Sequence, residues 1–398
     1  MAAARNSVDD LRGGLRLVTD AVCGITGIAS DMHRRIARVP TAAAGPLIGG
    51  AVNGTAAAVY GSVQGITRLV GGGLELALGA AAPALREQAT SAELDGLVSV
   101  LNGVLGDHLA RSDNPLALDM RLRHGGEDLP DSAGDIASRV PGCGSRLAVL
   151  VHGLCMNDAS WTRDGQDHGQ ALARDLGYCP LYLRYNSGRH ISSNGRLLAA
   201  VLESLLDNWP LPVDELALVG HSMGGLVIRS ACHYAALEQH AWPRRRCRLV
   251  FLGSPHLGAP LERGGSRLDH WIRLSPYTAP LARLGRIRSA GITDLRHGYL
   301  RDEQWQGHCR FEAAAADCDP LPLPAGMRCH AVAASLREDR AGIMGDGLVP
   351  VHSALGRHAD RRQSLRFPEA QRAVVYGAGH FDLLSRRDVY ERIRAWLA

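Results

Sequence analysis

Short apolar runs, separated by longer amphipathic stretches, recur through the C-terminal part of this chain. Runs that are short and continuous are typical of strands buried on both faces of a parallel sheet, and the stretches between them have a helical period. The sequence therefore predicts an α/β fold with a mostly parallel central sheet. The runs are RLAVLV (146–151), PLYLRY (180–185), LALVG (216–220), RLVFLG (248–253), MRCHAVAA (327–334) and QRAVVYG (371–377), with LALDMRLRH (116–124) as an earlier edge strand.

The chain has 398 residues, which is long enough for a large domain with an additional module. Residues from about 11 to 90 are rich in Ala, Gly, Val and Leu and poor in aromatic residues. We therefore expect an N-terminal Gly/Ala-rich helical region over 1–110 and the α/β domain over 111–398. The connection after the run at 248–253 is too long for a simple crossover, so we expect a helical cap insertion at about 259–326.

Ser222 follows the run at 216–220 almost directly, in the pattern G-x-S-x-G at 220–224. In α/β sheets, ligands bind beyond the carboxyl ends of the strands. A sharp strand-to-helix turn would carry the Ser222 hydroxyl into that crevice, and Gly220 and Gly224 would permit the close packing that such a turn needs. This setting predicts a nucleophilic serine.

A serine hydroxyl needs a general base, and the base needs an orienting acid. In proteins with this strand-to-helix serine, the acid and then the histidine follow the serine in the chain. His380 follows the last apolar run and is the expected base; His352 and His358 are interpreted as loop or surface residues. Asp346, in GDGLVP, follows the run at 327–334 and is the expected acid.

Two other aspartates compete for the role of the acid. Asp339 lies in the polar run REDR, which is typical of a solvated loop, and it stays open as the alternative. Asp382 lies two residues after His380 and is interpreted as a cap of the final helix.

A tetrahedral intermediate also needs two N–H donors. The residue after the nucleophile, Met223, supplies one expected donor through its backbone. The second is expected in the loop that follows the run at 146–151, where HGL (152–154) places Leu154. The alternative is that HGL only ends a strand.

These segments together resemble the α/β-hydrolase superfamily of the lipase and esterase type. The matching segments are HGL (152–154), GHSMGG (220–225), LGSPHLGAP (252–260), GDGLVP (345–350) and GH (379–380). The resemblance covers about 145–398 and implies Ser222, Asp346 and His380 as the triad, with Leu154 and Met223 at the oxyanion hole. RYNSGRHISSNGRLLA (184–199) and the long insertion are similar to a bacterial lipase-like branch related to glycosylphosphatidylinositol inositol-deacylases.

The N-terminal region contains an internal repeat of 11 residues. AVNGTAAAVYG (51–61) aligns with SVQGITRLVGG (62–72), and VTDAVCGITGI (18–28) aligns with 59–69. A period of 11 keeps an apolar stripe on one helix face. Glycine-rich helices need a partner surface, so residues 1–90 are expected to contact a lipid surface peripherally, or alternatively to pack as a helical hairpin on the hydrolase or on a second copy.

Composition narrows the range of partners and locations. The 44 basic residues are all arginines and are scattered, and the net charge is only +4, so no nucleic-acid binding is expected. The nine cysteines show no zinc-ligand spacing, and most are interpreted as small core residues. Cys309 and Cys318 are close enough to pair, although two free thiols are favoured. No signal peptide and no membrane span are recognised, which predicts a cytoplasmic protein, with peripheral lipid contact left open.

The function expected from these observations is hydrolysis of hydrophobic carboxylic esters through an acyl-enzyme, without a metal or a cofactor. Acyl transfer to an alcohol would use the same three residues. A hydrolase fold that serves only as a binding scaffold would normally have lost one of them. The sequence does not define the acyl chain length, the head group or the oligomeric state.

Overall fold

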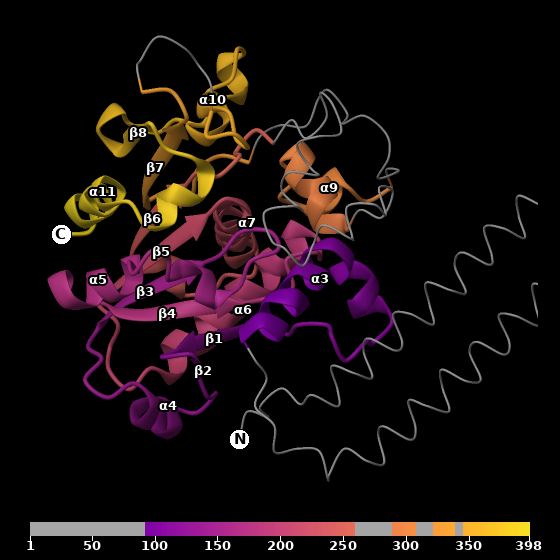
Figure 1. Cartoon of the computed structure of the whole chain (residues 1–398). Helices are drawn as coiled ribbons and strands as arrows, with labels where there is room; N and C mark the ends of the chain where they lie inside the picture. Colours follow the sequence, from indigo (N-terminus) through magenta and orange to yellow (C-terminus); the bar gives the residue numbers. More distant parts are fainter. Residues whose placement is uncertain (1–91, 259–288, 308–320, 339–344) are drawn as a thin grey trace, which may run out of the picture. The chain divides into compact units, whose positions relative to one another are not determined.

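The computed structural model describes residues 92–258, 289–307, 321–338 and 345–398 (Figure 1). The expected N-terminal repeat, Asp339, the pair Cys309 and Cys318, and much of the expected cap insertion lie outside the described residues. Of the described residues, Ala92 and Arg111–Ala117 fall in one compact unit; Glu93–Ala110 and the residues from Leu118 onward fall in another, which contains the sheet.

One eight-stranded sheet runs through the described part of the chain, in the order β2-β1-β4-β3-β5-β6-β7-β8. The six strands from β4 to β8 in that order are parallel, whereas β1 pairs antiparallel with both β4 and β2. The strands are β1 (Arg121–His124), β2 (Glu127–Asp128), β3 (Arg146–Val151), β4 (Cys179–Arg184), β5 (Glu215–His221), β6 (Arg246–Leu252), β7 (Arg328–Ser335) and β8 (Arg372–Tyr376).

Helices cover both faces of this sheet. Successive side chains of a strand point to opposite faces, so each strand contributes to an apolar core on either side. Leu147 and Val149 of β3 belong to the apolar core that contains residues of α6 and α7. Ala148 and Leu150 belong to a second core with residues of α5 and α11. The described helices are α3 (Ala92–Arg111), α4 (Ala133–Arg139), α5 (His168–Leu176), α6 (Ile191–Asn208), α7 (Met223–Leu237), α9 (Ala290–His297), α10 (Val351–Ala354) and α11 (Arg387–Leu397).

Short 3₁₀ helices complete the connections. They are η2 (Asp158–Trp161), η3 (Trp242–Arg244), η5 (Asp302–Gln304), η6 (Arg361–Gln363), η7 (Glu369–Gln371) and η8 (His380–Leu384). Within the expected cap insertion, the described residues form α9 and η5. Among the helices that the structure describes, none combines the length and the apolarity that crossing a membrane requires.

The expected fold class, a mostly parallel sheet with flanking helices, is confirmed. Each of the six predicted buried runs forms a parallel strand, and the predicted edge strand appears as β1 at the end of its run. The hairpin to β2 was not expected, although Gly125 and Gly126, with φ of 58° and 83°, carry the glycine signal of a tight turn.

Residues Glu93–Ala110 of helix α3 fall in the same compact unit as the sheet. We had expected these residues in the N-terminal region, because the first expected strand of the α/β domain begins only at residue 116. The separate helical region expected further upstream lies outside the described residues and stays a prediction.

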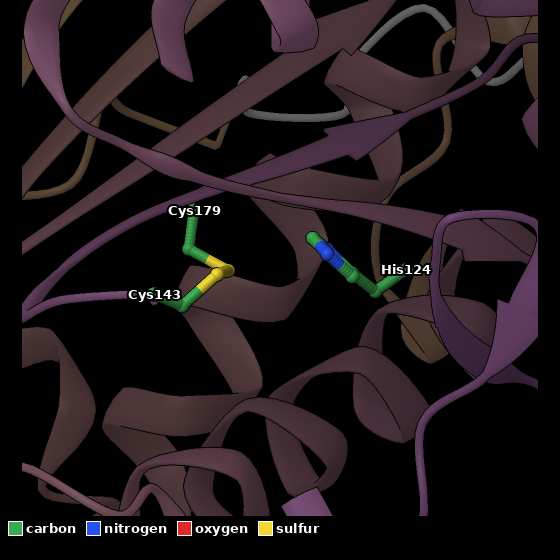
Figure 2. A group of neighbouring side chains, drawn as sticks. All are labelled: His124, Cys143 and Cys179. Atoms are coloured by element: carbon green, nitrogen blue, oxygen red, sulfur yellow. A yellow bond between two sulfur atoms is a disulfide. The ribbon is translucent and has the colours of Figure 1, made fainter. Parts of the chain in front are cut away.

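A disulfide joins Cys143, in the loop before β3, to Cys179, the first residue of β4 (Figure 2). We had not expected this pair from the sequence. Cys232, Cys247 and Cys329 are buried free thiols, as expected of small core residues. A stable disulfide is typical of an oxidising compartment. The disulfide does not favour the expected cytoplasmic location, so that location stays a prediction.

Candidate active site

Ser222 lies in a one-residue turn between β5, which ends at His221, and α7, which begins at Met223. Its backbone angles are φ 54° and ψ −123°, a region that residues with a side chain rarely adopt. The flanking glycines are required by contact: a methyl group on Gly220 would lie 2.6 Å from the N of Gly225, and one on Gly224 would lie 2.6 Å from the O of His152. The start of α7 therefore packs directly on the ends of the central strands.

The Ser222 hydroxyl is fully buried, and its Oγ has no hydrogen-bond partner among the described residues. The backbone N–H of Ser222 donates to the O of Leu252 at the end of β6, at 2.8 Å. On the other side lies Gly153, where a methyl group would approach Ser222 Cβ to 3.1 Å. The loop after β3 thus borders the serine.

Asp346 and His380 form a buried pair. Nδ1 of His380 lies 2.7 Å from Oδ2 of Asp346, and both side chains are 1% exposed. Oδ1 of Asp346 accepts from the backbone N–H groups of Leu348 and Val349, at 2.9 and 2.7 Å. A carboxylate on Nδ1 keeps the proton of a neutral imidazole on that nitrogen, which leaves the Nε2 lone pair to accept a proton.

The residues next to Ser222 bring this pair to the serine's edge of the sheet. Nε2 of His221 donates to the O of His380 at 3.1 Å, and the two ring centroids are 4.7 Å apart. Gly253 directly follows Leu252, and a methyl group there would lie 3.1 Å from Cε1 of His380. The structure therefore places Ser222, Asp346 and His380 after the carboxyl ends of β5, β7 and β8.

Two further histidines in this region are held neutral. Burial, with a smaller contribution from His380, lowers the pKa of His221 well below its usual value. Burial also lowers the pKa of His152 to about 4. Since neither imidazole is charged near neutral pH, neither adds positive charge beside His380. No role was expected for the His221 side chain, because its contact with His380 joins segments far apart in the chain.

The loop after β3, residues 152–156, contains the expected oxyanion donor Leu154, a buried residue. Cys155 follows it with φ 60°, and its N–H donates to Oγ of Ser187 at 3.1 Å. The hydroxyl of Tyr185 donates to the O of His152 at 2.8 Å. Met223, the other expected donor, is the first residue of α7, where backbone N–H groups have no intrahelical partner.

The competing residues lie elsewhere. His352 and His358 are exposed, in agreement with their interpretation as surface residues. We expected Asp382 to cap the final helix, and this expectation is wrong. Its Oδ2 accepts from the N–H of Gly379 at 2.8 Å, so it caps η8. Asp339 lies outside the described residues.

A search for metal-binding clusters in the described part of the chain gives His124, Cys143 and Cys179, whose ligand atoms lie within 4.8 Å of one another (Figure 2). The two sulfurs are joined to each other in the disulfide. Nδ1 of His124 lies 2.9 Å from the O of Pro180. The oxidised sulfurs are not thiolates and do not form a metal site.

Comparison with known proteins gives one family. A model described as the alpha/beta hydrolase family matches residues 148–393, which is more than half of the chain. A solved lipase of Bacillus licheniformis in its mature form is similar over 65% of this chain and 93% of its own, with 18% identity and a TM-score of 0.42. A search of curated protein sequences gave no match.

Two further solved structures show similar likenesses. For an esterase of Pyrococcus furiosus, the coverage is 64% of this chain and 81% of that one, with 14% identity and a TM-score of 0.37. For a type II thioesterase from the yersiniabactin biosynthetic pathway, the coverage is 64% and 92%, with 16% identity and a TM-score of 0.38.

Proposed function

This chain belongs to the alpha/beta hydrolase family, and on that premise we propose that it hydrolyses carboxylic esters with hydrophobic acyl groups, using Ser222 as the nucleophile. The observation that carries the proposal is the buried Asp346–His380 pair, at 2.7 Å, at the sheet edge where Ser222 occupies its strained turn. A strained turn and a buried acid–base pair both cost stability, and an acyl-transfer reaction is a reason for a protein to keep them together.

In the proposed reaction, Oγ of Ser222 forms a bond to the ester carbonyl carbon as Nε2 of His380 takes the hydroxyl proton. The oxyanion that forms is stabilised by the N–H groups of Leu154 and Met223. Collapse of the intermediate breaks the bond to the alcohol, which leaves with the proton from His380. Water, deprotonated by His380, then attacks the acyl carbon; the bond from that carbon to Oγ of Ser222 breaks, His380 returns the proton to Oγ, and the acid is released. Asp346 keeps the imidazole oriented and stabilises its protonated form.

The apolar content of the expected cap insertion supports a hydrophobic acyl group. Apolar residues such as Trp271, Ile272 and Leu274 in an insertion of this kind are expected to line or cover a pocket. The relation to inositol-deacylases stays a prediction, and a lipid-surface contact through residues 1–90 belongs to the same proposal.

The proposal is tested by hydrolysis of an ester series with increasing acyl chain length, with the Ser222→Ala variant as the control. We expect turnover of long-chain esters to exceed that of acetate esters, and turnover to be abolished in Ser222→Ala. Equal rates for wild type and Ser222→Ala would contradict the proposed nucleophile. Preference for acetate, unchanged in Trp271→Ala, would contradict the hydrophobic acyl group.

A further inference from the structure

Helix α3 lies outside residues 148–393, which the family model covers, yet it packs against the loop that borders Ser222. It is drawn in indigo in Figure 1, beside α9. The side chain of Ser289, at the start of α9, donates to the O of Gly103 in α3 at 2.7 Å. The helix is therefore packed into the edge of the domain where the candidate site lies.

The closest approach is between Gly103 and Cys155. A methyl group on Gly103 would lie 2.8 Å from both the N and the Cα of Cys155, and would overlap its Sγ. Two of these three neighbouring atoms are backbone, so a side chain at position 103 would displace the chain at Cys155. That residue directly follows Leu154, the expected oxyanion donor, and already has a positive φ of 60°.

The opposite side of this loop is held by the segment after β4. Ser187 accepts the N–H of Cys155, and Tyr185 donates to the O of His152. The same segment is attached to α3, because Nδ2 of Asn186 donates to the O of Gly106 at 2.9 Å. The loop at 152–156 therefore lies between α3 and the segment 185–187, and that segment is itself hydrogen-bonded to α3.

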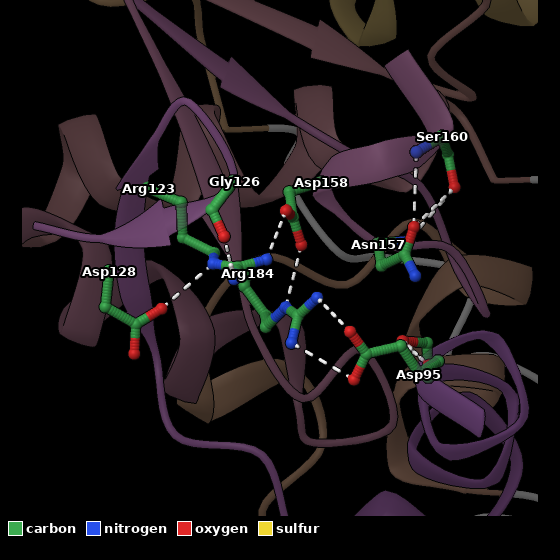
Figure 3. A network of polar contacts seen from close by, with 9 residues as sticks. Asp95, Arg123, Gly126, Asp128, Asn157, Asp158, Ser160 and Arg184 are labelled. Carbon is green, nitrogen blue, oxygen red and sulfur yellow. Dashed lines mark hydrogen bonds and ion pairs between the residues drawn. The ribbon is translucent and has the colours of Figure 1, made fainter. Parts of the chain in front are cut away.

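Charged side chains fasten the beginning of α3 to the same region (Figure 3). Nη2 of Arg184, at the end of β4, lies 3.1 Å from Oδ2 of Asp95 in α3, and its Nε lies 2.7 Å from Oδ1 of Asp158 in η2. Nη1 of Arg123 donates to the other oxygen of Asp158 at 2.6 Å. Burial alone would raise the pKa of Asp158, but Arg184 and Arg123 lower it below its usual value, so the carboxylate stays charged.

We propose that α3 is a positioning element of the oxyanion hole, with Gly103 setting the place of the Leu154 N–H through its contact with Cys155. This inference rests on the proposed function. Oxyanion donors stabilise the transition state only when they meet the developing charge at hydrogen-bond distance, so a shift of the loop would weaken them. Gly103 would act through Cys155 and would not touch the substrate.

The test compares two identical substitutions in the same helix, made in the full chain. Gly103→Ala places a methyl group against Cys155, whereas Gly96→Ala places one where, among the described residues outside the helix's own backbone, no atom lies within 4 Å. Both gain the same helix propensity. On a short soluble ester, Gly103→Ala should lower kcat about 10²-fold, as expected for a displacement of about 1 Å, with little change in KM. Gly96→Ala should match the wild type.

A second measurement separates positioning from a general loss of structure. A trifluoromethyl ketone forms a tetrahedral adduct with the serine and places its oxyanion in the hole. Its affinity should fall in Gly103→Ala by the same factor as kcat/KM. A folded Gly103→Ala protein with wild-type kcat and wild-type inhibitor affinity would overturn the proposal.

If Gly103→Ala does not fold, Asn186→Ala decides the matter, because it removes the hydrogen bond that joins the segment after β4 to Gly106 of α3. A fall in kcat and inhibitor affinity at unchanged KM would support the proposal, and wild-type values would overturn it. Failure of the proposed function itself would be recognised separately, since turnover by the wild type would then not depend on Ser222.

Discussion

Ser222 adopts, at φ 54° and ψ −123°, a conformation that a glycine would accept more readily. Holding a residue with a side chain in such a region costs about 1–3 kcal/mol. The turn persists because β5, α7 and the loop after β3 pack around it. If the strain is kept for the sake of the nucleophile, a variant with glycine at position 222 should be inactive but more stable than a variant that keeps a Cβ there.

We therefore expect Ser222→Gly to have a larger free energy of unfolding than Ser222→Ala, by about 1 kcal/mol once the greater unfolded-state entropy of glycine is subtracted. Urea unfolding of the two variants measures the difference, and the pair is matched because both lack the hydroxyl. A less stable glycine variant would show that the turn is not strained in the protein.

Asp346 holds the imidazole of His380 by one oxygen and two backbone N–H groups by the other. Asp346→Asn would let the imidazole adopt the wrong tautomer, and the corresponding change in another serine enzyme lowers kcat about 10⁴-fold. Steady-state ester hydrolysis should show a loss of this order, whereas Asp339→Asn should remain close to the wild type. The reverse result would transfer the role of the acid to Asp339.

At the scale of elements, the sequence is most informative where one local pattern determines the outcome. The run at 146–151 forms β3 with those bounds, and the glycine-flanked serine occupies the junction of β5 and α7. Contacts between distant segments leave no such local pattern. The bond from His221 to His380 and the packing of Gly103 on Cys155 depend on how the elements meet, so neither could be predicted from spacing.

The disulfide is a further contact that no local pattern predicts, because its cysteines are separated by 36 positions and neither lies in a recognisable motif. Closing a loop of this length is expected to stabilise the fold by about 4 kcal/mol through the unfolded state. Treatment with dithiothreitol should therefore lower the melting temperature of the wild type.

The double variant Cys143→Ser/Cys179→Ser supplies the control for reduction. Its melting temperature should be lower than that of the oxidised wild type and should not respond to dithiothreitol. An untreated wild-type protein in which thiol titration finds both cysteines free, or whose melting temperature is unchanged by reduction, would contradict the assigned disulfide.

At the scale of the whole molecule, the contacts that build the candidate site lie within the compact unit that includes Glu93–Ala110 and the residues from Leu118 onward. A chain that begins at residue 91 keeps α3 and should hydrolyse a small soluble ester like the full chain. It should lose most of its co-flotation with liposomes, or most of its self-association, if residues 1–90 mediate these contacts. Activity, liposome co-flotation and self-association would be measured on both proteins.

Two outcomes would contradict this division of roles. A truncated protein that is insoluble and inactive would show that the first ninety residues belong to the hydrolase core. A truncated protein that is active and binds liposomes as well as the full chain would show that the 11-residue repeat has no interfacial role. The 11-residue period predicts a helix with one apolar face, but it does not predict which surface that face contacts.

Covalent labelling shows directly whether Ser222 is an activated nucleophile. A fluorophosphonate probe reacts with an activated serine, and peptide mass spectrometry locates the modified residue. The account predicts one label on the wild-type chain, at Ser222, and no label on Ser222→Ala. A label on another residue, or undiminished labelling of Ser222→Ala, would remove Ser222 from the mechanism and contradict the account.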